Sequence, residues 1–110
     1  MAEPLTITTE NFDQEVLQAT SPVLIDFWAP WCAPCRVIGP VVEEFATQYA
    51  AKLKVGKLNV DEHPAVAMRY HISGIPALLF FNKGAVVDTV VGAVPRSVLQ
   101  KHIDGVVGNT

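Results

Sequence analysis

The distribution of apolar residues is clearest between Val23 and Trp28, where the chain reads VLIDFW. Every residue of this segment except Asp26 is apolar, and Pro22 and Pro30 stand on either side of it. A short and nearly continuous apolar run between prolines is typical of a β-strand that is covered on both faces. The pattern therefore predicts a central buried strand that carries one carboxylate.

A helical pattern follows this strand and extends from Pro34 to about Tyr49. Its apolar residues recur every three or four positions, as on one face of an amphipathic helix. Pro40 lies inside the pattern, removes one backbone donor and is expected to bend the helix. The predicted apolar face comprises Val37, Ile38, Val41, Val42, Phe45, Ala46 and Tyr49, while Glu43, Glu44 and Gln48 face away.

The rest of the chain alternates between shorter strands and helices. Asn11 is placed to cap the first of these helices, Pro95 opens the last, and Gly84 lies in the turn of a hairpin. This βαβαβαββα order predicts an α/β fold, in which parallel strands with right-handed crossovers and a final antiparallel hairpin form one mixed sheet with helices on both faces. The expected strands are Leu5–Thr9, Lys54–Val60, Ala77–Phe81 and Ala85–Val91, and the expected helices are Asn11–Ala19, Pro64–Tyr70 and a C-terminal helix from Pro95.

The composition fits one compact domain over residues 1–110. Half of the residues are hydrophobic, 17% are charged and the net charge is −3, so a core can form. No basic cluster occurs, which argues against nucleic acid as a partner. The longest apolar run, Ala77–Phe81, is too short to cross a membrane. The N-terminal residues lack the pattern of a secretory signal, so we expect a cytoplasmic protein unless a targeting peptide has been removed.

The only two cysteines, Cys32 and Cys35, lie between the buried strand and the long helix. C-x-x-C in this position is typical of a redox-active dithiol in an intracellular chain, where structural disulfides are uncommon. Cys32 falls at the helix N-terminus, where free N–H groups and the helix dipole stabilise a thiolate and lower the pKa of the thiol. Cys35 lies one turn inside the helix and is expected to be more buried and less acidic. The pattern predicts that Cys32 attacks a disulfide and Cys35 resolves the mixed disulfide.

Other roles for the cysteine pair fit the sequence less well. A zinc site needs four ligands, and the spacings of His63, His71 and His102 match no common zinc motif, so we predict no metal. A purely structural disulfide would close a loop of only a few residues and would restrict the unfolded chain little. Two incidental thiols remain an alternative, in which the protein would be a partner-binding module.

Two charged residues lie where the pattern predicts burial. Asp26 interrupts the central strand, and because a buried carboxylate is costly unless paired, burial should raise its pKa. Such an acid close to a dithiol is a candidate proton acceptor for the second thiol. Lys57 is enclosed by Val55, Leu58 and Val60 in the next strand. The alternatives are an aspartate at a strand edge and a solvated strand lysine.

Five segments together resemble the thioredoxin family: FWAPWCAPCRVIGP, DFW, GIPALLFF, KLNVDEHP and VGAVPRSVL. The resemblance covers essentially the whole chain, and W-C-x-P-C with a downstream G-I-P is highly specific. It implies a thioredoxin fold, with a mixed five-stranded central sheet flanked by four helices. It also implies a protein-disulfide reductase that needs no bound cofactor and is itself reduced by a flavin-containing, NADPH-dependent thioredoxin reductase.

The resemblance also assigns roles to individual positions. Cys32 and Cys35 are the attacking and the resolving thiol, Asp26 resembles a buried acid beneath Cys35, and Lys57 resembles its neighbour on the adjacent strand. Pro76 matches a cis-proline that faces the cysteine pair. The remaining site residues are an apolar rim that docks partner proteins, namely Trp31, Gly74, Ile75, Gly92 and Ala93, and a structural support of Trp28, Pro34, Pro40 and Asp61.

Ala33 and Ala77 depart from the commonest family pattern, which has glycine at the first position and threonine at the second. Position 33 precedes a proline and is extended in any case, so alanine fits without strain and the reaction type should be retained. The reduction potential and partner preference are left open. An oxidant or isomerase of the same fold is the alternative enzyme. Nothing in the sequence suggests more than a monomer.

Overall fold

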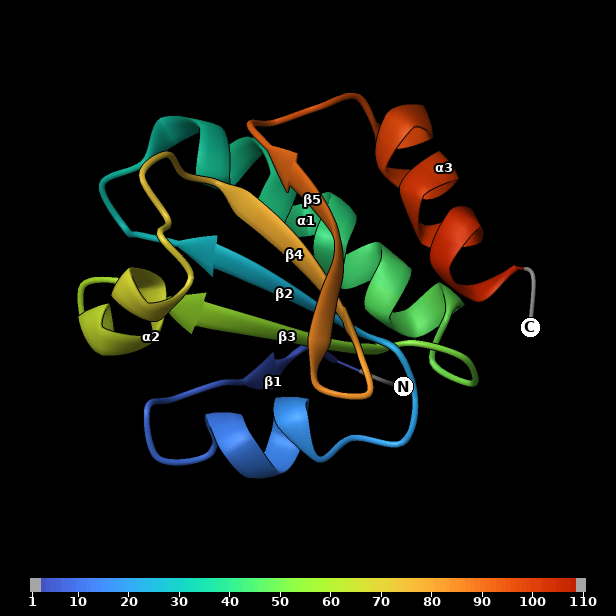
Figure 1. Ribbon diagram of the computed structural model, residues 1–110. Helices are drawn as coiled ribbons and strands as arrows, with labels where there is room; N and C mark the ends of the chain where they lie inside the picture. Colours follow the sequence, from blue (N-terminus) through green and yellow to red (C-terminus); the bar gives the residue numbers. More distant parts are fainter. Residues whose placement is uncertain (1–2, 109–110) are drawn as a thin grey trace.

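The computed structural model describes residues 3–108. Within them, one sheet has the strand order β1-β3-β2-β4-β5; β1, β3 and β2 run parallel, and β4 and β5 are each antiparallel to their neighbours (Figure 1). The predicted α/β fold, with a mixed five-stranded sheet and four helices, is confirmed. The elements are β1 (Leu5–Thr6), the π-helical turn η1 (Asp13–Leu17), β2 (Val23–Trp28), α1 (Ala33–Gln48), β3 (Lys54–Asn59), α2 (Pro64–Arg69), β4 (Ala77–Asn82), β5 (Ala85–Val91) and α3 (Arg96–Val107).

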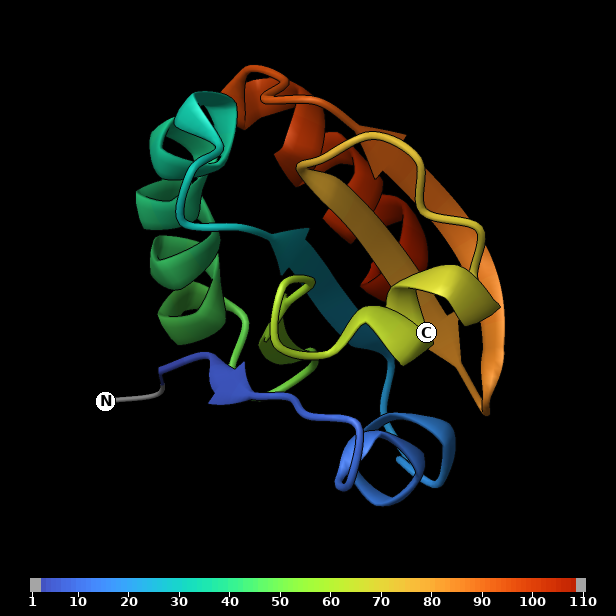
Figure 2. The same ribbon diagram turned by 90° about the vertical axis from the view of Figure 1, so that its left-hand side faces the viewer.

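The sheet divides the core into two layers, because successive side chains of a strand point to opposite faces. In β2, Leu24 packs in the layer formed with α1 and α3, whereas Ile25 and Phe27 pack in the layer formed with η1 and α2. Figure 2 shows α1 and α2 on opposite sides of the sheet. By the same alternation, Asp26 faces the α1 side, as Leu24 does.

β2 is covered on both faces, as its apolar pattern predicts. Its first five residues are buried, and it is hydrogen-bonded to β3 on one side and to β4 on the other. In these registers Asp26 lies between Lys57 of β3 and Leu78 of β4. The sheet therefore places one carboxylate and one ammonium next to each other on the face that α1 covers.

The N-terminal elements are shorter than predicted. β1 contains two residues instead of Leu5–Thr9, and the first helix is the single turn η1 instead of Asn11–Ala19. Asn11 does not cap this helix, because its Oδ1 accepts the Thr8 N–H at 2.7 Å and so closes the preceding turn. Short amide side chains readily bond to nearby backbone in this way, which competes with helix capping.

One valine assigned to the apolar face of the long helix is exposed instead: Val37 of α1 has 69% of its surface exposed. In α3, Val98 is also exposed, at 37%. Because the sheet covers only one side of each helix, the buried stripe is narrower than the apolar pattern. In α3 this stripe consists of Leu99, Ile103 and Val107.

The β4–β5 hairpin closes as predicted at Gly84. Lys83 and Gly84 form a two-residue turn in which both residues have positive φ, 52° and 83°. A Cβ at Gly84 would lie 3.1 Å from the Leu17 carbonyl oxygen, so both the backbone conformation and the available space favour glycine here. Along residues 3–108, no helix has the length and the apolar character that crossing a bilayer requires.

Candidate active site

Cys32 and Cys35 form a disulfide at the start of α1, with their Cα atoms 5.3 Å apart. Cys32 is the N-cap residue, with an extended backbone, and its Sγ accepts the N–H of Cys35 at 3.2 Å. Pro34 lies in the first turn, where its missing N–H leaves no helical bond unmade. The predicted position of Cys32 at a helix N-terminus is thus confirmed, whereas the expectation that Ala33 is extended is wrong, because α1 begins at Ala33 and the extended residue is Cys32.

The two cysteines are equally buried, each with 4% of its surface exposed, so the expectation that Cys35 would be the more buried is wrong. Cys32 is covered because it packs with Ala29, Trp28 and Ile75. The carbonyl oxygen of Ile75 lies 3.7 Å from Cys32 Sγ. Helix position alone did not predict the contact with Ile75, which belongs to a loop 43 residues further along the chain.

The loop before β4 lies beside the start of α1 (Figure 1). The Ile75–Pro76 peptide bond is cis, as the resemblance implied. The N–H of Gly92 donates to the Pro76 carbonyl at 2.8 Å, which joins the end of β5 to this loop. A Cβ at Gly74 would lie 3.5 Å from the Val91 side chain. Three predicted rim positions, 74, 75 and 92, therefore lie in or beside the loop that carries Pro76, and Ile75 of this loop contacts Cys32.

The loop between β2 and α1 is held by the segment that follows β3. Trp31 is 68% exposed, and its indole N–H donates to both carboxylate oxygens of Asp61, at 3.0 and 3.2 Å. The Trp28 carbonyl accepts the Val60 N–H at 2.9 Å. Ala93 is exposed after β5. The hydrogen bonds to Trp31 place Asp61 against the cysteine loop, and the Trp28 carbonyl joins the end of β2 to the residues after β3. The supporting role of Trp28 and Asp61 stays a prediction.

Asp26 is fully buried. Neither of its carboxylate oxygens has a hydrogen-bonding partner among the described residues. Burial raises the pKa of Asp26 to about 7, and the positive charge of Lys57 partly offsets this rise. A carboxyl group with this pKa is about half ionised at pH 7 and can exchange a proton at neutral pH.

Lys57 leans toward α1 rather than bonding to Asp26. Its Nζ lies 3.5 Å from Glu43 Oε2 and 5.4 Å from the centroid of the Trp28 ring. A Cβ at Gly39 would stand 3.4 Å from this nitrogen, so the missing side chain leaves room for it. A pocket of about 200 Å³ opens here; it is lined by Trp28, Cys35, Arg36, Gly39, Pro40, Glu43 and Lys57.

Sequence reasoning missed the contribution of Gly39 and Glu43 to this region. Both follow Cys35 at intervals of four residues, which places all three along one face of α1. That spacing was the available signal. Glu43 is 58% exposed, as predicted for the outer face, yet its carboxylate reaches Lys57. The bend expected at Pro40 inside α1 stays a prediction.

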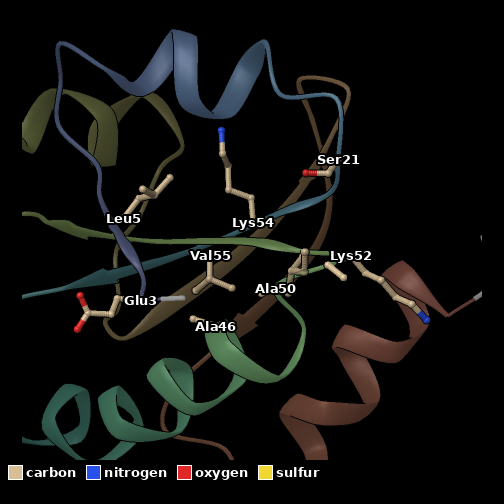
Figure 3. A pocket seen from close by; sticks show the side chains of 10 residues that line it. Glu3, Leu5, Ser21, Ala46, Ala50, Lys52, Lys54 and Val55 are labelled. Carbon is tan, nitrogen blue, oxygen red and sulfur yellow. The ribbon is translucent and has the colours of Figure 1, made fainter. Parts of the chain in front are cut away.

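Two of the other pockets are larger than the one beside Cys35. One, of about 310 Å³, lies at the opposite end of β3, where small and apolar side chains surround Val55 and the Lys54 side chain points toward η1 (Figure 3). Another, of about 440 Å³, lies between β5 and the segment 69–74. The described residues contain no group of three or more His, Cys, Asp or Glu arranged to hold a metal ion.

A dithiol pair at a helix N-terminus, facing a cis-proline loop on a mixed sheet, defines the class of thiol–disulfide oxidoreductases with a thioredoxin fold. A family model described as Thioredoxin matches residues 3–105. The chain belongs to the thioredoxin family.

Relatives agree with this assignment. The chain is 52% identical to "Thioredoxin 1" of Synechococcus elongatus and 51% identical to "Thioredoxin 1" of a Nostoc species, each match covering 94% of this chain and 97% of the relative. It is 53% identical to "Thioredoxin C-2" of Corynebacterium nephridii, over 88% of this chain and 90% of the relative. The protein is a protein-disulfide reductase that cycles between the Cys32/Cys35 dithiol and the disulfide, and disulfide-containing proteins are its substrates.

Proposed function

We propose that Cys32 is the attacking thiol and Cys35 the resolving thiol. The Cys32 thiolate attacks one sulfur of a substrate disulfide; a Cys32–substrate disulfide forms, and the other substrate sulfur leaves as a thiolate. The Cys35 thiolate then attacks Cys32 Sγ, the Cys32–Cys35 disulfide forms, and the second substrate thiolate is released. Two electrons pass from the dithiol to the substrate. The position of Cys32 at the N-terminus of α1 supports this order, because a thiolate is stabilised there.

Asp26 is proposed to accept the proton that Cys35 loses before it attacks. Two observations support this role: the carboxyl is buried on the α1 side of the sheet without a hydrogen-bonding partner, and its pKa lies at about 7. A base with a pKa near the working pH is the most effective proton acceptor. Lys57 is proposed to act on the same step through its positive charge.

The rim beside Cys32 is proposed to dock the substrate protein. Ile75 would pair its backbone with an extended substrate segment, and the exposed indole of Trp31 would add apolar contact. Pro76 is proposed to set the direction of this backbone. Gly74, Gly92 and Ala93 carry little or no side chain, which lets a substrate chain approach closely.

The electron donor is proposed to be a flavin-containing, NADPH-dependent thioredoxin reductase. A dithiol that is oxidised in every cycle needs continual reduction, so the protein is placed in a reducing compartment, the cytoplasm. It is proposed to act as a monomer without a bound cofactor, because one chain carries both cysteines and every other residue of the proposed site.

The disulfide at the N-terminus of α1 carries this proposal, and the Cys35→Ser variant tests it. With insulin as substrate, we expect a stable one-to-one adduct that is linked through Cys32 and released by dithiothreitol. Cys32→Ser is the matched control and should form no adduct, because Cys35 does not attack substrate. Adducts on Cys32→Ser, or none on Cys35→Ser while the wild type reduces insulin, would contradict the assignment of the two thiols.

A further inference from the structure

We propose that Glu43 is a positioning residue that holds the Lys57 ammonium at the mouth of the pocket beside Cys35, away from Asp26. By doing so it limits how strongly Lys57 stabilises the ionised form of Asp26. This inference rests on the proposed role of Asp26 as the proton acceptor for Cys35.

The contacts of Lys57 carry the inference. Lys57 and Asp26 are paired in register on β3 and β2 and face the same side of the sheet, so Asp26 is the carboxylate that the sheet itself offers to the lysine. The ion pair nevertheless forms with Glu43 of α1, at 3.5 Å, while both Asp26 oxygens lack a hydrogen-bonding partner in the described part of the chain. The Lys57 ammonium therefore pairs with the surface carboxylate of Glu43, although the position of Lys57 on β3 places it beside Asp26.

Two neighbours favour this arrangement. Gly39 leaves open the space beside Lys57 Nζ that a Cβ would occupy at 3.4 Å. The Trp28 ring lies on another side of the ammonium, with its centroid 5.4 Å from Nζ, where cation–π attraction operates. The Lys57 side chain is 24% exposed, so solvent screens its interactions only in part.

The other charged groups near Lys57 come from two pockets. Arg36 and Cys35 of α1 line the pocket that contains Glu43, and β4 contributes only the apolar Leu78 next to Asp26. A second pocket, of about 160 Å³, brings Glu62 and His63 to Lys57. The His63 Nδ1 accepts the Thr9 N–H at 3.1 Å, which holds this ring toward the N-terminal segment.

The consequence concerns the proton of Cys35. That proton passes from the Cys35 thiol to the ionised Asp26, while Glu43 and Lys57 neither gain nor lose one. If Lys57 moves closer to Asp26, the ionised carboxylate is stabilised and becomes a weaker base, but it stays ionised at lower pH. When Lys57 is released from Glu43, the resolving step should therefore stay fast at lower pH.

The experiment follows the resolving step separately from the attack. The reduced protein is mixed with a symmetric aromatic disulfide whose thiolate is coloured; attack by Cys32 releases the first thiolate, and attack by Cys35 on the mixed disulfide releases the second. The rate of the second phase is measured against pH. In the Glu43→Gln variant, we expect the acidic limb of this profile to move to lower pH by at least about 0.5 unit.

Three matched variants separate positioning from a general change of charge. Glu44→Gln removes the same charge one residue further along α1, where the carboxylate pairs with Arg96, and should leave the limb in place. His63→Gln should also leave it in place. In a Lys57→Gln background, Glu43→Gln should move the limb by less than half as much as it does in the wild type, because the lysine through which it acts is gone.

The inference is overturned if Glu43→Gln leaves the limb unmoved, if Glu44→Gln moves it equally, or if the shift is the same without Lys57. Each of these results leaves the proposed role of Asp26 intact. That role fails separately if Asp26→Asn has the same acidic limb as the wild type. A shift confined to Glu43→Gln and dependent on Lys57 supports the positioning role.

Discussion

Two lysines of β3 lie three residues apart and face opposite sides of the sheet. They differ in how they interact with nearby carboxylates. Lys54 is bonded to Glu15 Oε1 at 2.9 Å and to the Glu15 carbonyl at 2.8 Å, which ties β3 to η1. Lys57 instead lies between a surface carboxylate, Glu43, and a buried one, Asp26, which it leaves without a hydrogen bond. The first arrangement has satisfied partners and serves stability; the second keeps a carboxyl group able to change its charge.

The difference matters for the proposed role of Asp26 as a proton acceptor, because Asp26 is buried without a hydrogen-bonding partner among the described residues. A buried carboxylate bonded like Glu15 would stay ionised and be a weak base, whereas desolvation keeps the pKa of Asp26 near neutral. The cost is a less stable fold above that pH. Under the proposed role of Asp26, the side of the sheet with Lys57 is less stable but able to exchange a proton, whereas on the other side Lys54 is paired with Glu15.

The largest expected effect is that of Asp26→Ala on stability as a function of pH. The pKa of Asp26 is raised in the folded protein. Between about pH 4 and pH 7, Asp26 is therefore protonated in the native state and ionised in the unfolded state. The wild type consequently loses stability as the pH rises through that window. At about 1.4 kcal/mol per pKa unit, the free energy of unfolding of Asp26→Ala relative to wild type should increase by about 3–4 kcal/mol from pH 4 to pH 8.

This change is measured by urea unfolding of both proteins at a series of pH values. Any cost of the cavity left by the shorter side chain is the same at every pH and cancels in the comparison. Lys54→Gln is a suitable control, because its effect should not follow this window. A difference between Asp26→Ala and wild type that is flat from pH 4 to pH 8 would mean that Asp26 is ionised throughout.

The next effect distinguishes the two lysines directly. Lys57→Gln removes the positive charge that lowers the pKa of Asp26, so the acidic limb of the resolving step should move to higher pH by roughly 0.5–1 unit. Lys54→Gln should leave the limb unchanged and instead lower the free energy of unfolding by about 1 kcal/mol. The coloured-disulfide assay and urea unfolding measure the two quantities. Equal shifts of the limb in both variants would remove the distinction between the two faces.

The smallest effect is expected for Gly39→Ala. Alanine is favoured over glycine inside a helix, and the nearest atom to the new Cβ is the end of the flexible Lys57 side chain, so the free energy of unfolding should rise by about 0.5–1 kcal/mol. The same Cβ should displace the ammonium slightly. Thermal or urea unfolding checks the first point, and a loss of stability would show that the space beside Lys57 is already full.

Much of this arrangement could be predicted from the sequence because it depends on local pattern. The buried strand around Asp26 follows from an apolar run between prolines, and the place of Cys32 follows from its position before a helical pattern. The identity of the cis-proline did not follow from any pattern, since eight prolines were available and only the family resemblance singled out Pro76.

Other features could not be predicted because they depend on contacts between distant segments. Ile75 contributes to the burial of Cys32 from 43 residues away, and the position of the Lys57 ammonium depends on the α1 residue with which it pairs. Asn11 is of a residue type that often caps helices, but its side chain instead accepts the backbone N–H of Thr8. In the first two cases the tertiary structure selected the outcome, whereas at Asn11 the local turn with Thr8 did.

The central claim is that Asp26 is a buried acid that changes its charge near neutral pH. Its side-chain carboxyl carbon can be followed by NMR in the oxidised protein from pH 4 to pH 9, with Asp26→Asn used to assign the signal. The predicted result is a single transition with a midpoint at about 7. A midpoint near the ordinary aspartate value of about 4 would show that the carboxylate is ionised throughout, and would contradict the account.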